Sequence, residues 1–221
     1  MFNAFFTRLA RQAMLALTFA ACSGYAAAGT IHVEINTASF GNAGWIELQF
    51  NPAPGSTTSA TALLSNFSGF TPFADAILDG DASGSLASGF SINNSGAVNA
   101  VVQSSSFGGI LSFDVTFSGA FDAVGPIGQS VLALIAYDEN FGVVGNFDPV
   151  DNTLAKLTWT PGSAAGVNGT VGIDVFDQGA VSAVPEPATW LLMGLGLAVV
   201  AFTARRRASA NDAGVHGALA A

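Results

Sequence analysis

Apolar and polar residues alternate along short segments between positions 29 and 184, and glycine, serine, asparagine and proline separate these segments. The clearest segment is 111–118, where Leu, Phe, Val and Phe alternate with Ser, Asp, Thr and Ser. Because successive side chains of a strand point to opposite faces, this period of two predicts strands with one buried face. The same pattern predicts strands in further segments: 31–35, 46–50, 90–92, 98–103, 154–160 and 171–176.

Residues 131–137 are apolar on both faces of the predicted strand, which indicates a central position in a sheet. Turn sequences such as Asp79-Gly80-Asp81 separate the strands at a spacing of about ten residues. The two prolines in 51–55 are expected to end the sheet ladder. We therefore expect an all-β domain, an antiparallel β-sandwich or jelly roll, with Trp45 and Trp159 in its core.

The C-terminal part of the chain carries a second kind of pattern. Residues 188–204 are an uncharged apolar run of 17 residues, followed by Arg205, Arg206 and Arg207. At about 1.5 Å per residue this helix would measure roughly 25 Å, the short end of the range for a bilayer span. Clustered arginines stay in the cytoplasm. The pattern predicts one transmembrane helix, with 208–221 as a cytoplasmic tail and the preceding domain outside the cytoplasm.

The N-terminal residues predict a signal peptide. Two arginines precede the apolar segment 13–21, and Ala26 and Ala28 provide an A-x-A cleavage site. We expect residues 1–28 to direct export through the Sec translocon and then to be removed. An uncleaved anchor is the alternative, but the apolar segment is short for one.

Cys22 is the only cysteine of the chain and would also allow a lipoprotein signal. Phe19 stands where such signals usually have leucine, which favours ordinary cleavage at Ala28. The mature chain would then contain no cysteine. That excludes disulfides, thiolate metal sites and a cysteine nucleophile from the exported domain.

Three features in sequence order carry a family resemblance: Pro185-Glu186-Pro187, the apolar run 188–204 and the arginine cluster 205–207. Hydropathy alone leaves open a plain anchor whose prolines only begin the helix. Together, however, the features resemble the PEP-CTERM sorting domain of exopolysaccharide-producing Gram-negative bacteria. The resemblance implies recognition of the tail by an exosortase, a membrane-embedded transpeptidase, and removal of the tail. One departure is the tail 208–221, since members of the family usually end sooner after the arginines.

The middle of the chain resembles a recurring, uncharacterised group of secreted β-rich proteins with the same tail. The resemblance implies no activity and adds no site residue. It is carried by short, mostly strand-like sequences: Gln49-Phe50-Asn51-Pro52, Leu64-Ser65-Asn66-Phe67, Gly84-Ser85-Leu86 and Leu111-Ser112-Phe113-Asp114-Val115.

The expected organisation is therefore a signal peptide (1–28), a β-sandwich passenger domain (29–183), a sorting segment (184–207) and a cytoplasmic tail (208–221). Between 29 and 184 there are thirteen carboxylates and one basic residue, Lys156, a net charge of −12 against −9 for the whole chain. This charge excludes nucleic acid as a partner and disfavours anionic polysaccharide unless divalent cations bridge the two.

The candidate chemistry of the passenger domain is sparse. His32 is its only histidine and is interpreted as a surface residue, and no G-x-S-x-G nucleophile motif is present. Two acidic clusters are candidate calcium sites, although neither has EF-hand spacing, and solvated turns are the default interpretation. The candidate ligands are Asp79 and Asp81 in one cluster and Asp148 and Asp151 in the other.

These observations predict a non-enzymatic protein of the cell envelope or extracellular matrix, structural or adhesive and linked to exopolysaccharide and biofilm. Its expected partners are the Sec translocon, an exosortase, the membrane through its C-terminal helix, and polysaccharide. We expect inner-membrane anchoring with the passenger domain in the periplasm, then surface or extracellular location after processing. No cofactor is expected apart from the calcium sites above. The alternatives are a calcium-dependent carbohydrate-binding module and an exopolysaccharide hydrolase.

Overall fold

The computed structural model describes residues 29–71, 76–121, 128–164, 167, 169–185, 194 and 198. Residues 25–185 form one compact unit, and 1–24 with 186–221 form another, of which Gly194 and Ala198 are described, both helical. The predicted signal peptide, arginine cluster and cytoplasmic tail lie outside the described residues, as does the predicted transmembrane helix apart from these two positions. Among the residues that are described, no helix is both long and apolar enough to cross a membrane.

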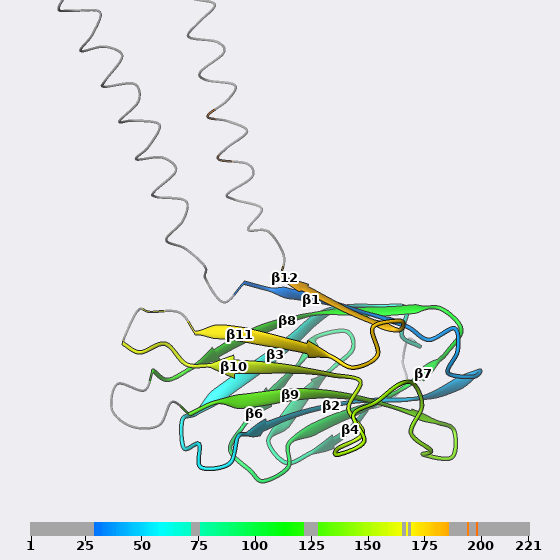
Figure 1. Ribbon diagram of the computed structural model, residues 1–221, viewed down its shortest axis with the longest axis horizontal. Helices are drawn as coiled ribbons and strands as arrows, with labels where there is room; N and C mark the ends of the chain where they lie inside the picture. Colours follow the sequence, from blue (N-terminus) through cyan, green and yellow to red (C-terminus); the bar gives the residue numbers. More distant parts are fainter. Residues whose placement is uncertain are drawn as a thin grey trace, which may run out of the picture. The chain divides into compact units, whose positions relative to one another are not determined.

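The described part of the first unit forms two six-stranded antiparallel sheets (Figure 1). The first sheet has the strand order β12-β1-β8-β3-β6-β5, and the second has the order β11-β10-β9-β2-β7-β4. The strand bounds are as follows: β1 Ile31–Asn36, β2 Ala43–Pro52, β3 Ala60–Ser68, β4 Ala76–Asp79, β5 Ala82–Ser85, β6 Gly89–Asn93, β7 Ala100–Ser106, β8 Ile110–Gly119, β9 Ser130–Asp138, β10 Ala155–Thr160, β11 Thr170–Val175 and β12 Val181–Pro185.

The first eight strands are paired from the outside inwards. β1 pairs with β8, β2 with β7 and β3 with β6, while β4 and β5 are joined by the turn at the centre of this sequence. This nested pairing is the topology of a jelly roll. The last four strands extend it: β9 pairs with β2, β10 with β9 and β11 with β10 in the second sheet, and β12 pairs with β1 in the first. The predicted all-β antiparallel sandwich is confirmed.

The core lies between the inner faces of the two sheets, because the apolar residues of each strand recur at every second position. Phe67 joins its largest aromatic cluster, with ring centroids 5.3 Å from Phe70, 5.4 Å from Phe90 and 5.5 Å from Phe113. Fully buried side chains of the core include those of Phe50, Phe90, Phe113, Ile35, Ile46, Leu48, Leu64 and Leu132.

Each predicted segment overlaps a strand, whereas β3, β4, β5 and β12 were not among the predicted segments. Three further differences concern the bounds. β2 continues through Pro52, which lies opposite Ser130 of β9, so the prolines do not end the ladder before this point. β7 starts at Ala100, and Val98, predicted within this strand, is 49% exposed. The amide side chain of Asn99 donates to the carbonyl of Gly96 at 3.2 Å and holds that turn before the strand begins. β12 runs through Pro185, two residues past the predicted end of the passenger domain.

Candidate functional site

The outer face of the second sheet carries a row of large polar and aromatic side chains. Trp45, Glu47, Gln49 and Asn51 are partly exposed, and the β2 residues between them, such as Leu48, are buried. We call these four side chains the β2 row. Since they follow one another at every second position of a strand, they point to the same side of the sheet.

Hydrogen bonds fix the middle of the β2 row. The hydroxyl of Tyr137 in β9 donates to Glu47 Oε2 at 2.7 Å, and Gln49 Nε2 donates to Glu47 Oε1 at 2.7 Å. Asn51 Nδ2 donates in turn to Gln49 Oε1 at 3.3 Å. Burial, together with the hydrogen bond to the Glu47 carboxylate and its charge, raises the pKa of Tyr137 well above its ordinary value. Tyr137 therefore remains a hydrogen-bond donor at any physiological pH.

An exposed aromatic ring is held over the start of the β2 row. Phe141 lies in the loop after β9, is 55% exposed and has a φ of 60°. This left-handed conformation is uncommon for a bulky residue. It is maintained by Asp138, whose Oδ1 accepts hydrogen bonds from the backbone N–H groups of Asn140 and Gly142, both at 2.8 Å.

The loop places Phe141 against Trp45. Their ring centroids are 5.3 Å apart and their planes are inclined by 15°, which is a stacked arrangement. Tyr137 completes the group, with its ring centroid 6.1 Å from that of Phe141. We call Trp45, Tyr137 and Phe141 the aromatic platform. A backbone conformation that opposes the preference of the residue, at an exposed aromatic side chain, is a sign of a functional constraint.

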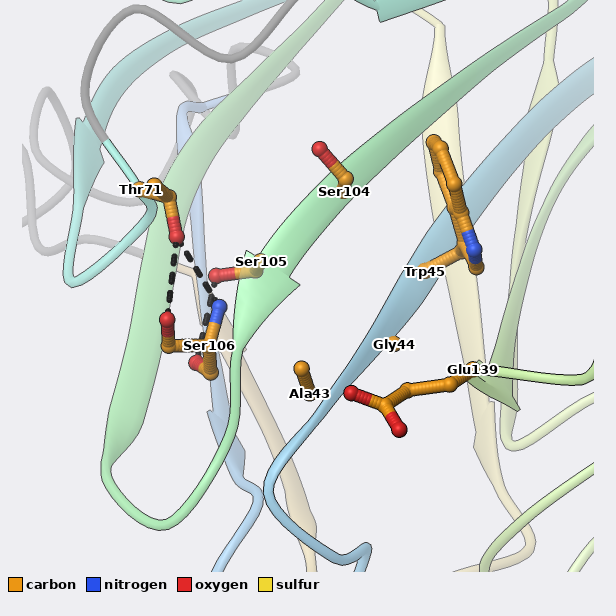
Figure 2. A pocket seen from close by; sticks show the side chains of 8 residues that line it. All are labelled: Ala43, Gly44, Trp45, Thr71, Ser104, Ser105, Ser106 and Glu139. Atoms are coloured by element: carbon orange, nitrogen blue, oxygen red, sulfur yellow. Dashed lines mark hydrogen bonds between the residues drawn. The ribbon is translucent and has the colours of Figure 1, made fainter.

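A shallow open pocket of about 350 Å³ adjoins the platform. Figure 2 shows Trp45 and Ser104 rising from the neighbouring strands β2 and β7, and Glu139 extending from the loop after β9 over the start of β2. Thr71 contributes the opposite side, where its hydroxyl accepts from the N–H of Ser106 at 2.9 Å (Figure 2). The lining residues are Ala43, Gly44, Trp45, Thr71, Ser104, Ser105, Ser106 and Glu139.

The sequence-based expectation for the tryptophans was wrong for one of the two. Trp159 is 2% exposed and belongs to the core, as predicted. Trp45 points outward and lines the pocket. The alternation in β2 contained the signal, because Trp45 falls in phase with Glu47 and Gln49 and not with Ile46 and Leu48. The platform itself could not be found from the sequence, since Phe141 lies in a loop.

The acidic clusters predicted as calcium ligands make other contacts. Lys156 Nζ lies 2.9 Å from Asp148 Oδ2 and 2.6 Å from Asp151 Oδ2, so an ammonium group is shared by both carboxylates. Asp81 accepts hydrogen bonds from Ser95 Oγ at 2.7 Å and Asn93 Nδ2 at 3.1 Å, and Asp79 accepts from the N–H of Gly80 at 2.8 Å. Within the described ranges, His, Cys, Asp and Glu form no group of three or more that could hold a metal ion.

These contacts change the acidity of the groups. The hydrogen bond from Lys156 lowers the pKa of Asp148. At Asp151, partial burial acts in the opposite direction, but the hydrogen bonds from Lys156 and Thr153 outweigh it and lower the pKa. Burial also opposes the charge of Lys156, and the two carboxylates more than compensate and raise its pKa. The cluster is therefore a charge-paired turn that fixes the start of β10.

His32 lies on the outer face of the first sheet, as its pattern predicted. Its Nδ1 is 2.6 Å from Asp114 Oδ1, and Asn66 Nδ2 donates to Asp114 Oδ2 at 2.6 Å. The other ring nitrogen, Nε2, is 3.6 Å from Glu34 Oε1. Both nitrogens of His32 thus face carboxylates, and the contact with the buried Asp114 joins β1 to β8.

The sorting residues predicted from the sequence fall at the end of the described unit. Pro185 is the last residue of β12 and lies opposite Ile31 of β1. Glu186, Pro187 and the three arginines lie outside the described residues, as do the cleavage residues Ala26 and Ala28. The candidate site lies on the second sheet, and Pro185 belongs to the first.

Comparison with known proteins identifies the tail. Residues 183–207 match the family model described as the PEP-CTERM protein-sorting motif. No curated protein and no solved structure matches the chain. The resemblance of the tail to the PEP-CTERM sorting domain is thereby confirmed.

Proposed function

We propose that this chain is a structural or adhesive protein of the cell envelope or extracellular matrix that works in association with exopolysaccharide and is not an enzyme. The PEP-CTERM motif at 183–207 implies a membrane-anchored exported protein of Gram-negative bacteria that an exosortase processes. The sandwich is the cargo. In this proposal it is anchored at the inner membrane with its domain in the periplasm, and is delivered to the surface or released.

The observation that carries the export and anchoring part of the proposal is the pairing of Ile31 with Pro185. The chain enters the sandwich at β1 and leaves it at β12, and these two strands are neighbours at one edge of the first sheet (Figure 1). The segments that precede β1 and follow β12 therefore connect to the same place on the domain. This arrangement suits a cargo that is held to one membrane from both ends during export and then freed by two cleavages.

The contacts of the described residues support a binding or structural role over catalysis. His32 Nδ1 lies 2.6 Å from Asp114 Oδ1, a contact that ties β1 to its neighbour β8. Of the acidic groups, Asp148 and Asp151 are paired with Lys156. A net charge of −12 between 29 and 184 keeps such a domain soluble outside the cell.

The proposal is tested with the full chain in a bacterium that has an exosortase and in the same strain without it. An epitope inserted in the exposed turn at Pro54-Gly55, where an added Cβ at Gly55 would meet nothing within 4 Å, allows detection without disturbing a strand. We expect the native chain to lose mass at both ends and to reach the surface or the polysaccharide matrix. Glu186→Ala and the strain without exosortase should both leave a larger, membrane-bound form.

Two results would contradict the proposal. One is a cytosolic chain of full mass in the exosortase strain. The other is a native chain that reaches the medium but is recovered there free of polysaccharide at every stage of growth, which would refute the adhesive role and leave export intact.

A further inference from the structure

We propose that the outer face of the second sheet binds a neutral polysaccharide, with one sugar ring in the pocket beside Trp45 and the chain running along the β2 row. The inference rests on the proposed function and names the ligand class of the site described above. It requires no metal ion, in contrast to a calcium-dependent carbohydrate-binding module.

The aromatic platform provides the stacking surface that a sugar ring needs. The C–H face of a pyranose is weakly positive and packs against the negative face of an aromatic ring. Phe141 covers one side of the Trp45 indole and holds it upright, so Trp45 does not have to be ordered when a ligand binds. Phe141 itself is 55% exposed, and its strained φ of 60° keeps the ring on this face.

The polar groups of the face match a ligand rich in hydroxyl groups. Both oxygens of Glu47 already accept hydrogen bonds from Tyr137 and Gln49, which fixes the carboxylate for a further donor. Ser104 and Glu139 add a hydroxyl and a second carboxylate at the pocket (Figure 2). From Trp45 to Asn51 the strand rises about 20 Å at ~3.4 Å per residue, a length that spans several sugar units.

Charge selects among polymers. The charged side chains of the β2 row and the pocket are Glu47 and Glu139, and both are negative. The single lysine of the domain, Lys156, is paired with Asp148 and Asp151. Uronic acids, sulfated glycans and phosphate polymers would be repelled, so the face favours a neutral glycan. A basic peptide also suits two carboxylates and can place a cation over an aromatic ring, but the amide and hydroxyl groups of Gln49, Asn51 and Ser104 favour a ligand rich in hydroxyl groups, and we treat the peptide as an outcome of the test.

The test is affinity electrophoresis of the full chain in detergent, in gels containing dextran, glucomannan or xyloglucan, with alginate as the anionic polymer. A competing arm adds oligolysine to the sample. We expect at least one neutral polymer to retard the native chain and alginate to have no effect. Trp45→Ala and Phe141→Gly should each weaken retardation roughly tenfold, the loss of about one stacking contact.

Phe141→Gly is the sharper variant, because glycine adopts a positive φ without strain and the loop keeps its shape. Its thermal midpoint should stay close to that of the native chain while binding falls. Phe121→Ala is the matched control: this phenylalanine follows β8 of the other sheet and is 50% exposed. It should bind like the native chain.

The inference is overturned if no neutral polymer retards the native chain, if Trp45→Ala binds as well as the native chain, or if oligolysine binds with the same dependence on Trp45 and Phe141. Retention in the matrix that persists in Trp45→Ala cells would refute this site and leave the proposed function standing. A chain that binds the polymer in the gel but is never exported would refute the proposed function and leave this site standing.

Discussion

Pro185, the first proline of the sorting motif, lies directly opposite Ile31 in the antiparallel ladder between β12 and β1. The motif therefore begins inside the sheet, at its edge, before the chain leaves the sandwich. An exosortase that binds the motif in extended form would reach Pro185 more easily when the end of β12 separates from β1. We therefore expect the rate of processing to depend on the stability of this edge strand.

Val181→Ala tests this connection. Val181 is 5% exposed and anchors the start of β12, so we expect the substitution to lower the free energy of unfolding by about 1–2 kcal/mol. Processing in the exosortase strain should become faster, because β12 opens more often. Urea denaturation and pulse–chase labelling measure the two effects.

Ser182→Ala is the control for Val181→Ala. Ser182 belongs to the same strand, is exposed and precedes the matched motif at 183–207, so neither stability nor processing should change appreciably. A less stable Val181→Ala chain that is processed at the native rate or more slowly would show that β12 does not limit access to the motif.

Lys156→Met should make the stability of the folded protein depend less on pH in the acid range. Asp148 and Asp151 have lowered pKa values in the folded protein. Their contribution to stability is therefore complete above their unfolded value of about 3.9 and is lost as the pH falls through the lower folded values. Without the ammonium group these pKa values return toward the unfolded value. Between about pH 5 and pH 2, the thermal midpoint of Lys156→Met should therefore fall less than that of the native chain.

At high pH the lysine of the same cluster gives the opposite dependence of stability on pH. The pKa of Lys156 is raised, so its contribution is present below the unfolded value of about 10.4 and is lost as the pH rises through the folded value. Asp174→Asn is the control. Asp174 lies opposite Lys156 in the β10–β11 ladder, and among the described residues no ion pair joins the two side chains. An equal acid slope in the native chain and in Lys156→Met would contradict the assignment.

Calcium should leave the thermal midpoint of the native chain unchanged. The ammonium of Lys156 lies within 3 Å of both Asp148 and Asp151, and a cation in that position would be repelled. In Lys156→Met the two carboxylates lose their partner, and we expect millimolar calcium to raise the midpoint of this variant. A rise in the native chain that a chelator reverses would instead support the calcium ligands inferred from the sequence.

Gly44→Ala should be strongly destabilising although Gly44 lies next to the pocket. A Cβ at this position would lie 2.0 Å from the carbonyl oxygen of Tyr137 and 2.5 Å from the ring of Phe107. The ladder between β2 and β9 would have to shift, at a cost of about 2 kcal/mol or more. Gly109→Ala is the control, since a Cβ there meets nothing within 4 Å. Equal thermal midpoints for the two variants would show that the ladder accommodates the methyl group.

The strands that could be predicted from the sequence are those with regular alternation. In β8, Leu111, Phe113 and Val115 are all buried, as the period of two requires. β4, β5 and β12 are short, and residues such as Ser83, Ser85 and Ser182 give no apolar period, so they are strands only because of the neighbours they pair with. Pairing between distant strands is not encoded locally.

The same reason explains what was missed in the candidate site. The pattern places Trp45 and Glu47 on one face. The position of Tyr137 opposite Trp45, however, follows from the register of β2 against β9. Phe141 reaches the platform only through the turn that Asp138 stabilises. Similarly, Asp114 was expected on a solvent-exposed face, and it is buried because β1 brings His32 against it.

Tyr137 offers a direct test of the hydrogen bond that fixes Glu47. The chain has two tyrosines, and the other, Tyr25, would be removed with the signal peptide, so the absorbance of the mature exported protein at high pH reports Tyr137 alone. Because the pKa of Tyr137 is raised in the folded protein, its contribution to stability is complete below the unfolded value of about 10 and declines above it. We expect no phenolate signal at pH 11 until the protein unfolds.

Glu47→Gln removes the negative charge and should allow ionisation of Tyr137 in the folded protein at lower pH, whereas Glu34→Gln, on the other sheet, should not. A native protein that shows phenolate near pH 10 while its fold is intact would mean that Tyr137 does not hold Glu47 as described.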